Sequence, residues 1–218
     1  QYLLCIALTF SFWVNVSAQE ISRESLGRPG PYQVAYYSSY PPVPEFSAAT
    51  IYFPANKGED FAGVAISPGF VESQENMSWW GRHLASHGFA VLTLDTNELR
   101  DNPSLRADAL MAAIEVLRNE GDRMGSTLRG KILKDRMAIM GHSKMGKTAL
   151  WTAAQDQRFA MAISAQSGCA GAALWRRKSG ETLKKMVTRF PYWLCRNAQK
   201  FVEQEDDLPV DQHMLLAC

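Results

Sequence analysis

The segment from Met137 to Lys147 constrains the fold of this chain more than any other. It begins with a short apolar run over 137–140 that has the length and composition of a buried strand. Gly141 ends this run, and Ser143 follows two residues later, just before an alanine-rich helical pattern over 148–154. The segment therefore predicts a strand, a sharp turn and a helix, with a serine at the bend.

The serine at the bend has two interpretations. A serine before a helix commonly caps it, because its hydroxyl accepts a hydrogen bond from an amide of the first turn. In the nucleophile elbow of α/β-hydrolases, the turn instead strains the serine backbone and exposes its hydroxyl beside amides that face a developing oxyanion. The strand before Ser143 and the helix after it favour the elbow. The usual spacing is G-x-S-x-G, whereas the second glycine here is Gly146, one position late.

The length and charge of the chain limit its class. The 218 residues are enough for one sizeable α/β domain with its own core. The 23 basic and 22 acidic side chains nearly balance, which argues against nucleic acid and against an anionic membrane surface as partners. We therefore expect a single domain over residues 19–218, acting as a monomer.

The first residues have the pattern of a targeting segment. An apolar stretch over 2–14 is followed by small residues at 16–18, as in a signal peptide that is cleaved before Gln19. The stretch is short for a transmembrane span. We expect a signal peptide over residues 1–18 and a secreted or periplasmic protein.

Cysteines and histidines give no sign of a metal site. Export permits disulfides, and among the cysteines after residue 18 a Cys169–Cys195 pair is the predicted one. The cysteine spacing matches no zinc pattern. His83 and His87 lie one helical turn apart without a suitably spaced carboxylate, so we interpret them as solvent-facing helix residues. We expect neither a metal nor an organic cofactor.

The remaining patterns alternate between strands and helices. They predict an antiparallel edge pair over 32–38 and 50–53, buried strands over 62–67, 89–95 and 159–165, helices over 76–87 and 104–120, and two or three helical pieces from 175 to 217. The order strand, helix, strand over 62–95 predicts a right-handed crossover onto a parallel sheet. In the helix over 104–120, Leu105 belongs to the predicted apolar face and Arg106 to the polar one.

Two loops lie where a pocket is expected. Pro68-Gly69-Phe70 ends the strand over 62–67 abruptly, either as an ordinary turn or as the source of a second oxyanion amide, that of Phe70. The small-residue loop over 166–171 follows the strand over 159–165. Ligands of open α/β sheets bind beyond the carboxyl ends of the strands, which places this loop at the pocket.

The part from Gly30 to about Gly141 closely resembles bacterial cutinases and polyester (poly(ethylene terephthalate)) hydrolases. The likeness rests on GPYQV at 30–34, GVAISPGF at 63–70, WWGR at 79–82 and LDTN at 94–97. It implies an α/β-hydrolase fold, with a mostly parallel sheet covered by helices on both faces. It also implies that Phe70 donates an oxyanion amide and lines the acyl pocket.

The part from Gly141 to the end resembles bacterial glucuronoyl esterases of carbohydrate esterase family fifteen, which cleave esters between lignin alcohols and the glucuronic acid of xylan. Their elbow has the pattern G-[CH]-S-R-x-G-K, which accounts for the late glycine. Matches include TALW at 148–151, SGC at 167–169, GAAL at 171–174, GET at 180–182 and DDLPVDQH at 206–213. The resemblance implies that Ser143 is the nucleophile and that Lys144 replaces an arginine that supports the oxyanion. It also implies that Lys147 and Glu181 hold sugar hydroxyls, unless they form only a solvated helix pair.

The remaining triad members are the difficulty in this resemblance. Gln166 falls where many members carry the triad carboxylate, and a glutamine cannot stabilise an imidazolium as an acid does. The triad order in this fold is Ser, acid, His, and His213, the one histidine after Ser143, matches a scaffold motif of the family rather than its base. We therefore expect a fragment, truncated at its C-terminus, whose catalytic histidine lies beyond Cys218.

These features together predict a secreted serine esterase. The favoured substrate is a glucuronoyl or related ester of the plant cell wall, attacked by Ser143. A cutinase-like polyester hydrolase is the alternative. A third possibility, from another class, is a non-catalytic carbohydrate-binding or inert fragment.

Overall fold

The computed structural model describes residues 22–217. The predicted signal peptide over residues 1–18 lies outside the described residues. Within residues 22–217, no helix is both long and apolar enough to cross a membrane.

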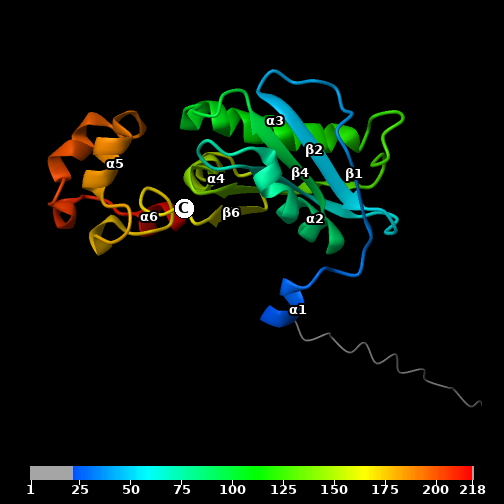
Figure 1. Cartoon of the computed structure of the whole chain (residues 1–218), viewed down its shortest axis with the longest axis horizontal. Coiled ribbons are helices and arrows are strands. Elements are labelled where there is room, and N and C mark those ends of the chain that lie inside the picture. The colour runs from blue at the N-terminus through cyan, green and yellow to red at the C-terminus, as the bar shows by residue number, and fades with distance from the viewer. Residues whose placement is uncertain (1–21, 218) are drawn as a thin grey trace, which may run out of the picture.

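One sheet of six strands organises the chain, in the order β1-β2-β4-β3-β5-β6 (Figure 1). The strands are β1 Val34–Tyr37, β2 Phe46–Pro54, β3 Phe61–Ser67, β4 Ala90–Thr96, β5 Ile132–His142 and β6 Met161–Ala165. β1 pairs with β2 and β2 with β4 in antiparallel fashion, and the other pairs are parallel. The predicted antiparallel edge pair and the crossover from β3 to β4 are confirmed, and the arrangement is consistent with an α/β-hydrolase.

Helices cover both faces of the sheet, as predicted. On one face α3 (Pro103–Glu120) and α4 (Lys144–Gln155) bury the larger core, which includes Leu92, Leu110, Leu117 and Ile139. On the other face α2 (Ser78–Ser86), preceded by the 3₁₀ turn η1 (Gln74–Met77), packs on a smaller cluster around Ile66. The carboxyl ends of β3 and β5 lie between these layers, and the loops that follow them build the site.

The chain after β6 forms a third cluster, around Cys169, Trp175, Leu183 and Met186. Its helices are α5 (Leu183–Arg189) and α6 (Gln212–Leu216), joined by the 3₁₀ turns η2 (Trp175–Arg177), η3 (Pro191–Trp193), η4 (Arg196–Phe201) and η5 (Glu205–Asp207). Figure 1 shows α5 to one side of the sheet. The buried carboxylate of Asp211 joins the ends of this segment, since it accepts hydrogen bonds from the amides of Trp175 and Gln212.

The predicted Cys169–Cys195 disulfide is wrong, because both cysteines are free. Cys169 is buried in the third cluster, where its thiol contacts the Leu174 carbonyl, 3.8 Å away. Cys195 is exposed at the start of η4. The two thiols therefore lie in different surroundings.

Three expectations about exposure are also corrected. β6 is half-buried, with Met161 59% exposed, because β5 is its one neighbour among the described strands. In α3 the predicted faces are reversed at two positions, since Leu105 is 51% exposed and Arg106 is fully buried. The first turn of α3 lies against loops that present carbonyl groups, and an arginine satisfies these groups where a leucine cannot.

His83 of α2 and His87, which follows the last residue of that helix, are half-buried rather than solvent-facing. The Nε2 atom of His83 lies 2.9 Å from the Leu26 carbonyl, and that of His87 lies 3.1 Å from the Arg28 carbonyl. Both imidazoles thus hold the segment that contains α1 (Arg23–Gly27) against α2.

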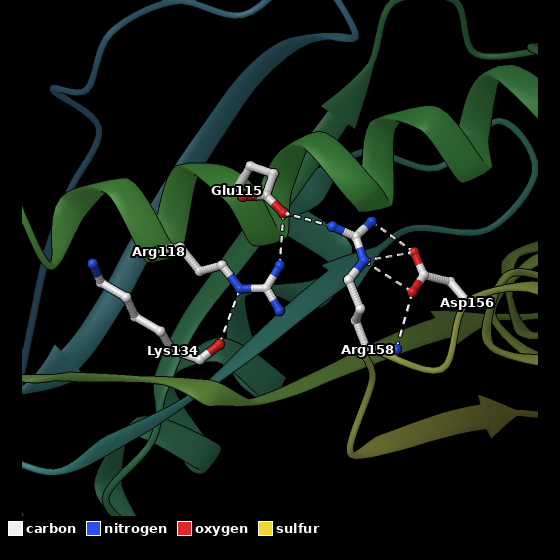
Figure 2. A network of polar contacts seen from close by, with 5 residues as sticks. All are labelled: Glu115, Arg118, Lys134, Asp156 and Arg158. Atoms are coloured by element: carbon white, nitrogen blue, oxygen red, sulfur yellow. Dashed lines mark hydrogen bonds and ion pairs between the residues drawn. The ribbon is translucent and has the colours of Figure 1, made fainter.

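A surface network joins α3, β5 and the loop between α4 and β6 (Figure 2). Arg118 donates hydrogen bonds to the Lys134 carbonyl, at 3.0 Å, and to Glu115, at 2.6 Å. Glu115 also pairs with Arg158, which binds Asp156 at 2.7 Å. Exposed pairs of this kind contribute little to stability, so the network mainly orients the loop before β6.

Candidate active site

Ser143 forms the turn between β5 and α4 with φ 54° and ψ −117°. A non-glycine residue rarely adopts a positive φ, and such strain persists only where the surrounding structure imposes it. The Ser143 amide donates to the Ala165 carbonyl at 2.9 Å, while its hydroxyl makes no capping hydrogen bond to α4. The predicted strained turn is therefore confirmed, and the interpretation of Ser143 as a helix cap is wrong.

Two glycines let the end of β5 and the start of α4 approach each other. A Cβ atom added to Gly141 would lie 2.0 Å from the Met145 carbonyl oxygen, and one added to Gly146 would lie 3.0 Å from the Ala165 carbonyl oxygen. The usual position of the second glycine is taken by Met145, which is fully buried in the core. The late glycine thus serves the contact with β6 and the loop that follows it.

The loop after β3 lies beside the elbow, because β3 and β5 are neighbours and Ser67 pairs with Gly141 in the parallel register. No hydrogen bond from the Phe70 or Lys144 amide to another described residue is found. Both amides are thus free to donate hydrogen bonds to an oxyanion. This is what we expect if the loop after β3 supplies the Phe70 amide to the oxyanion.

Arg106 holds this loop in place, a role that the sequence analysis missed. Its guanidinium donates to the carbonyls of Pro68 at 3.1 Å, Gly69 at 3.2 Å and Leu99 at 2.7 Å. The side chain is fully buried in α3, and burial lowers its pKa from the ordinary value. Arg106 lies four residues before Leu110 and eleven before Leu117, on the same face of the helix. This spacing could have indicated that Arg106 is buried.

Lys144 directs a buried ammonium group into the site. Its side chain is 1% exposed, and its Nζ atom donates to the Asp101 carbonyl. The same atom lies 5.2 Å from the centre of the Phe70 ring and 4.6 Å from that of Trp193, within cation–π range. Burial, and then the charge of Arg106, lower the pKa of Lys144 to about 8. The group is therefore cationic at neutral pH and loses its charge in mildly alkaline solution.

A pocket of about 530 Å³ brings most of the predicted site residues together. Ser143, Lys144, Lys147, Glu181 and Phe70 all line it, and Gln166 does not. The other lining residues are Arg100, Arg189, Phe190, Tyr192 and Trp193. The pocket thus lies between the elbow, the loops after β3 and β4, and the segment around α5.

Lys147 and Glu181 form an ion pair inside this pocket. Their Nζ and Oε2 atoms are 2.8 Å apart, and Lys147 also donates to the Ser167 carbonyl. The Lys147 side chain is only 12% exposed, and its partner precedes α5 rather than lying on α4. The pair is therefore only partly solvated, since the lysine is largely buried and the glutamate is about half exposed.

Gln166 contacts His142, a residue to which the sequence analysis gave no role. The His142 ring lies between two oxygens, with Nε2 2.9 Å from Oε1 of Gln166 and Nδ1 3.0 Å from Oε2 of Glu72. The same Glu72 oxygen accepts the Gly69 amide at 2.6 Å. A chain of polar contacts thus joins the loop after β3, the elbow and the loop after β6. His213 is exposed on α6 and does not line the pocket.

The environment of His142 predicts a pH-dependent contribution to stability. Burial lowers its pKa, but the hydrogen bonds to Gln166 and Glu72 and the charge of Glu72 outweigh burial and raise it above the ordinary value. A raised folded-state pKa stabilises the fold below the unfolded pKa of about 6.5, and this stabilisation is lost as the pH rises through the folded value.

We therefore expect the wild type to lose its stability advantage over Glu72→Gln as the pH rises above the ordinary histidine pKa of about 6.5. Glutamine keeps an oxygen for the Gly69 amide but removes the charge beside His142. Urea unfolding of both proteins at each pH measures the difference. A difference that stays constant with pH would contradict the assignment.

Comparisons with known proteins point to ester hydrolases. A family model described as PET hydrolase-like matches residues 23–183. Cutinase 2 of Thermobifida cellulosilytica is 40% identical over 118 residues, which cover 54% of this chain and 44% of that protein. The bis(hydroxyethyl) terephthalate hydrolase of Streptomyces coelicolor is 41% identical over 119 residues, covering 54% of this chain and 37% of that protein.

A third relative comes from another group of esterases. Carbohydrate esterase MZ0003, from an unknown prokaryotic organism, is 52% identical over 82 residues, which cover 38% of this chain and 19% of that protein. The chain thus spans less than half the length of each of these three relatives. The resemblance to cutinases and polyester hydrolases is confirmed, and the resemblance to glucuronoyl esterases stays a prediction. Because the family model covers well over half of the residues, the chain belongs to the PET hydrolase-like family.

Proposed function

We propose that this chain carries the acyl-transfer site of a serine carboxylic ester hydrolase. The observation that supports it best is the strained turn at Ser143, which faces a pocket next to the free amides of Phe70 and Lys144. The Ser143 oxygen would bond to the carbonyl carbon of the ester, and the two amides would stabilise the resulting oxyanion. As the bond to the alcohol breaks, the proton from the Ser143 hydroxyl ends on the leaving alcohol. Water then attacks the acyl-enzyme, which releases the acid and returns a proton to Ser143.

A histidine to act as the general base of this reaction is absent from the pocket lining of the described chain. His142 directs both ring nitrogens to Glu72 and Gln166, and His213 is exposed on α6. A serine hydroxyl without a base is a poor nucleophile, so we expect slow acylation of Ser143 by the chain alone. If the chain is instead an inert fragment, the wild type should be acylated no more than the Ser143→Ala variant.

We favour a glucuronoyl ester of the plant cell wall as the substrate. The pair formed by Lys147 and Glu181 offers a donor and an acceptor in the same pocket as Ser143, which is what sugar hydroxyls require. The carbohydrate esterase among the relatives supports this choice. We also propose export of the protein, on the basis of the apolar stretch over 2–14.

Glu181→Gln tests the sugar-binding role with little change of shape. We expect the KM for benzyl glucuronate to rise about tenfold, because one charge-assisted hydrogen bond contributes about 1.5 kcal/mol. The rate with 4-nitrophenyl acetate, which has no sugar, should stay within about twofold of the wild type. Equal losses with both esters would show that Glu181 supports the fold rather than the sugar.

A polyester is the second candidate substrate. Phe70 and Trp193 form an apolar wall of the pocket together with Phe190, whose ring stacks on that of Trp193 at 3.9 Å. Such a wall suits an aromatic or aliphatic acyl chain, and the cutinase relatives favour it. Product release from benzyl glucuronate and from a polyester film, each compared with Ser143→Ala, separates the candidates. Activity confined to the film would overturn the glucuronoyl assignment.

A further inference from the structure

The pocket beside Ser143 carries an excess of positive charge. Its lining has four basic side chains, Arg100, Lys144, Lys147 and Arg189, against one acidic side chain, Glu181. Glu181 neutralises one of them, since it pairs with Lys147 at 2.8 Å. The chain as a whole has a net charge of only +1, so the excess belongs to the pocket and not to the protein surface in general.

Arg100 and Arg189 are the basic residues of the pocket lining that remain available to bind a ligand. Both are exposed, and neither has an ion pair or a side-chain hydrogen bond to another residue of the described chain. Two lysines of the C-terminal segment are paired instead, Lys178 with Asp206 at 2.6 Å and Lys184 with Glu203 at 2.7 Å. Two unpaired guanidinium groups thus line the pocket that contains Ser143.

The positive lining continues away from the elbow. A second pocket of about 430 Å³ shares Glu181, Arg189 and Phe190 with the first, and adds Lys184 and Lys185 of α5. Lys185 donates to the Gly180 carbonyl and has no acidic partner among residues 22–217. A ligand that extends from Ser143 along α5 would thus meet further cationic groups.

We propose that the site prefers esters that carry a free carboxylate beyond the ester being cleaved, and that Arg100 and Arg189 bind this carboxylate. The proposal rests on the proposed esterase function. Guanidinium groups bind carboxylates through two parallel hydrogen bonds, which favours arginine at such a position. The rings of Phe70 and Trp193 offer a flat apolar face to the rest of the substrate. Half-esters of aromatic dicarboxylic acids and saccharides that contain uronic acid share this chemistry.

Binding to the Ser143→Ala variant tests the preference without relying on turnover. The first probe pair is monomethyl terephthalate and its neutral amide, methyl 4-carbamoylbenzoate. The second is a xylo-oligosaccharide with one free glucuronate and the neutral oligosaccharide of the same length. We expect the charged member of at least one pair to bind about tenfold more tightly at low salt, and this advantage to shrink as salt screens the exposed arginines. The pair that shows the preference identifies the source of the carboxylate.

Arg100→Gln/Arg189→Gln should abolish the preference. Arg129→Gln is the matched control, because Arg129 is also exposed and lies in the loop between α3 and β5, outside both pockets. Equal binding of charged and neutral members in both pairs would overturn the proposal, as would a preference that survives the double substitution. Failure of the esterase function would show separately, as unreactive Ser143 in the wild-type chain.

Discussion

Replacing Arg106 with methionine is expected to lower the free energy of unfolding by about 3–5 kcal/mol. The substitution leaves the Pro68 carbonyl without its donor, which costs about 1–3 kcal/mol in a buried place. The carbonyls of Gly69 and Leu99 keep the amides of Glu72 and Val71 but each lose a hydrogen bond to a charged donor, which contributes about 1.5–3 kcal/mol. Because the same carbonyls position the loop that contains Phe70, the acylation rate of Ser143 should fall further than stability alone explains. Urea unfolding and acylation by an activated ester under folding conditions measure the two effects.

Arg129→Met is the control for this substitution, since Arg129 is exposed and has no ion pair within residues 22–217. We expect it to change the free energy of unfolding by less than about 0.5 kcal/mol. Arg106→Lys should fall between the two variants, because lysine keeps a buried donor but cannot reach three carbonyls at once. If Arg106→Met were as stable as Arg129→Met, the assigned role of the guanidinium would be wrong.

Among substitutions that add one methyl group to a glycine, we expect Gly141→Ala to lower the free energy of unfolding the most. The added Cβ would lie 2.0 Å from the Met145 carbonyl oxygen and 2.2 Å from its carbon, and both are backbone atoms that cannot turn aside. The start of α4 would have to move away from β5, which would relax the turn at Ser143. We expect a loss of more than about 4 kcal/mol, measured by urea unfolding, and loss of acylation in any folded fraction.

Gly58→Ala is the matched control, because nothing lies within 4 Å of a Cβ at that exposed position. We expect its free energy of unfolding to stay within about 0.5 kcal/mol of the wild type. A folded Gly141→Ala protein that acylates as fast as Gly58→Ala would show that the close approach at the elbow is not required for the reactivity of Ser143.

The elbow could be predicted from the sequence because its signals are consecutive. An apolar run, a glycine, a serine and an alanine-rich helix occupy one short segment, and each has a local physical meaning. The antiparallel edge pair and the crossover onto β4 depend on patterns of the same kind, and both are confirmed. Neighbouring strands then bring Phe70 to the side of Ser143.

The features that were missed depend on contacts between distant segments. Glu72 and Gln166 lie 70 and 24 residues from His142 in sequence, and no local pattern joins the three. Arg106 is buried because two loops direct carbonyls at it, whereas a charge in a helical pattern alone indicates a solvated face. The disulfide prediction failed since a count of cysteines contains no information about their surroundings.

Covalent labelling of the full chain with a fluorophosphonate, followed by mass spectrometry of its peptides, tests the role of Ser143 most directly. We expect one equivalent of label on Ser143 and no label in Ser143→Ala. Labelling should be slow, because no histidine lines the described pocket, and faster at higher pH, where more of the hydroxyl is deprotonated. Label on a different residue, or an unlabelled Ser143 after prolonged incubation at high pH, would contradict the presentation of this hydroxyl to an ester.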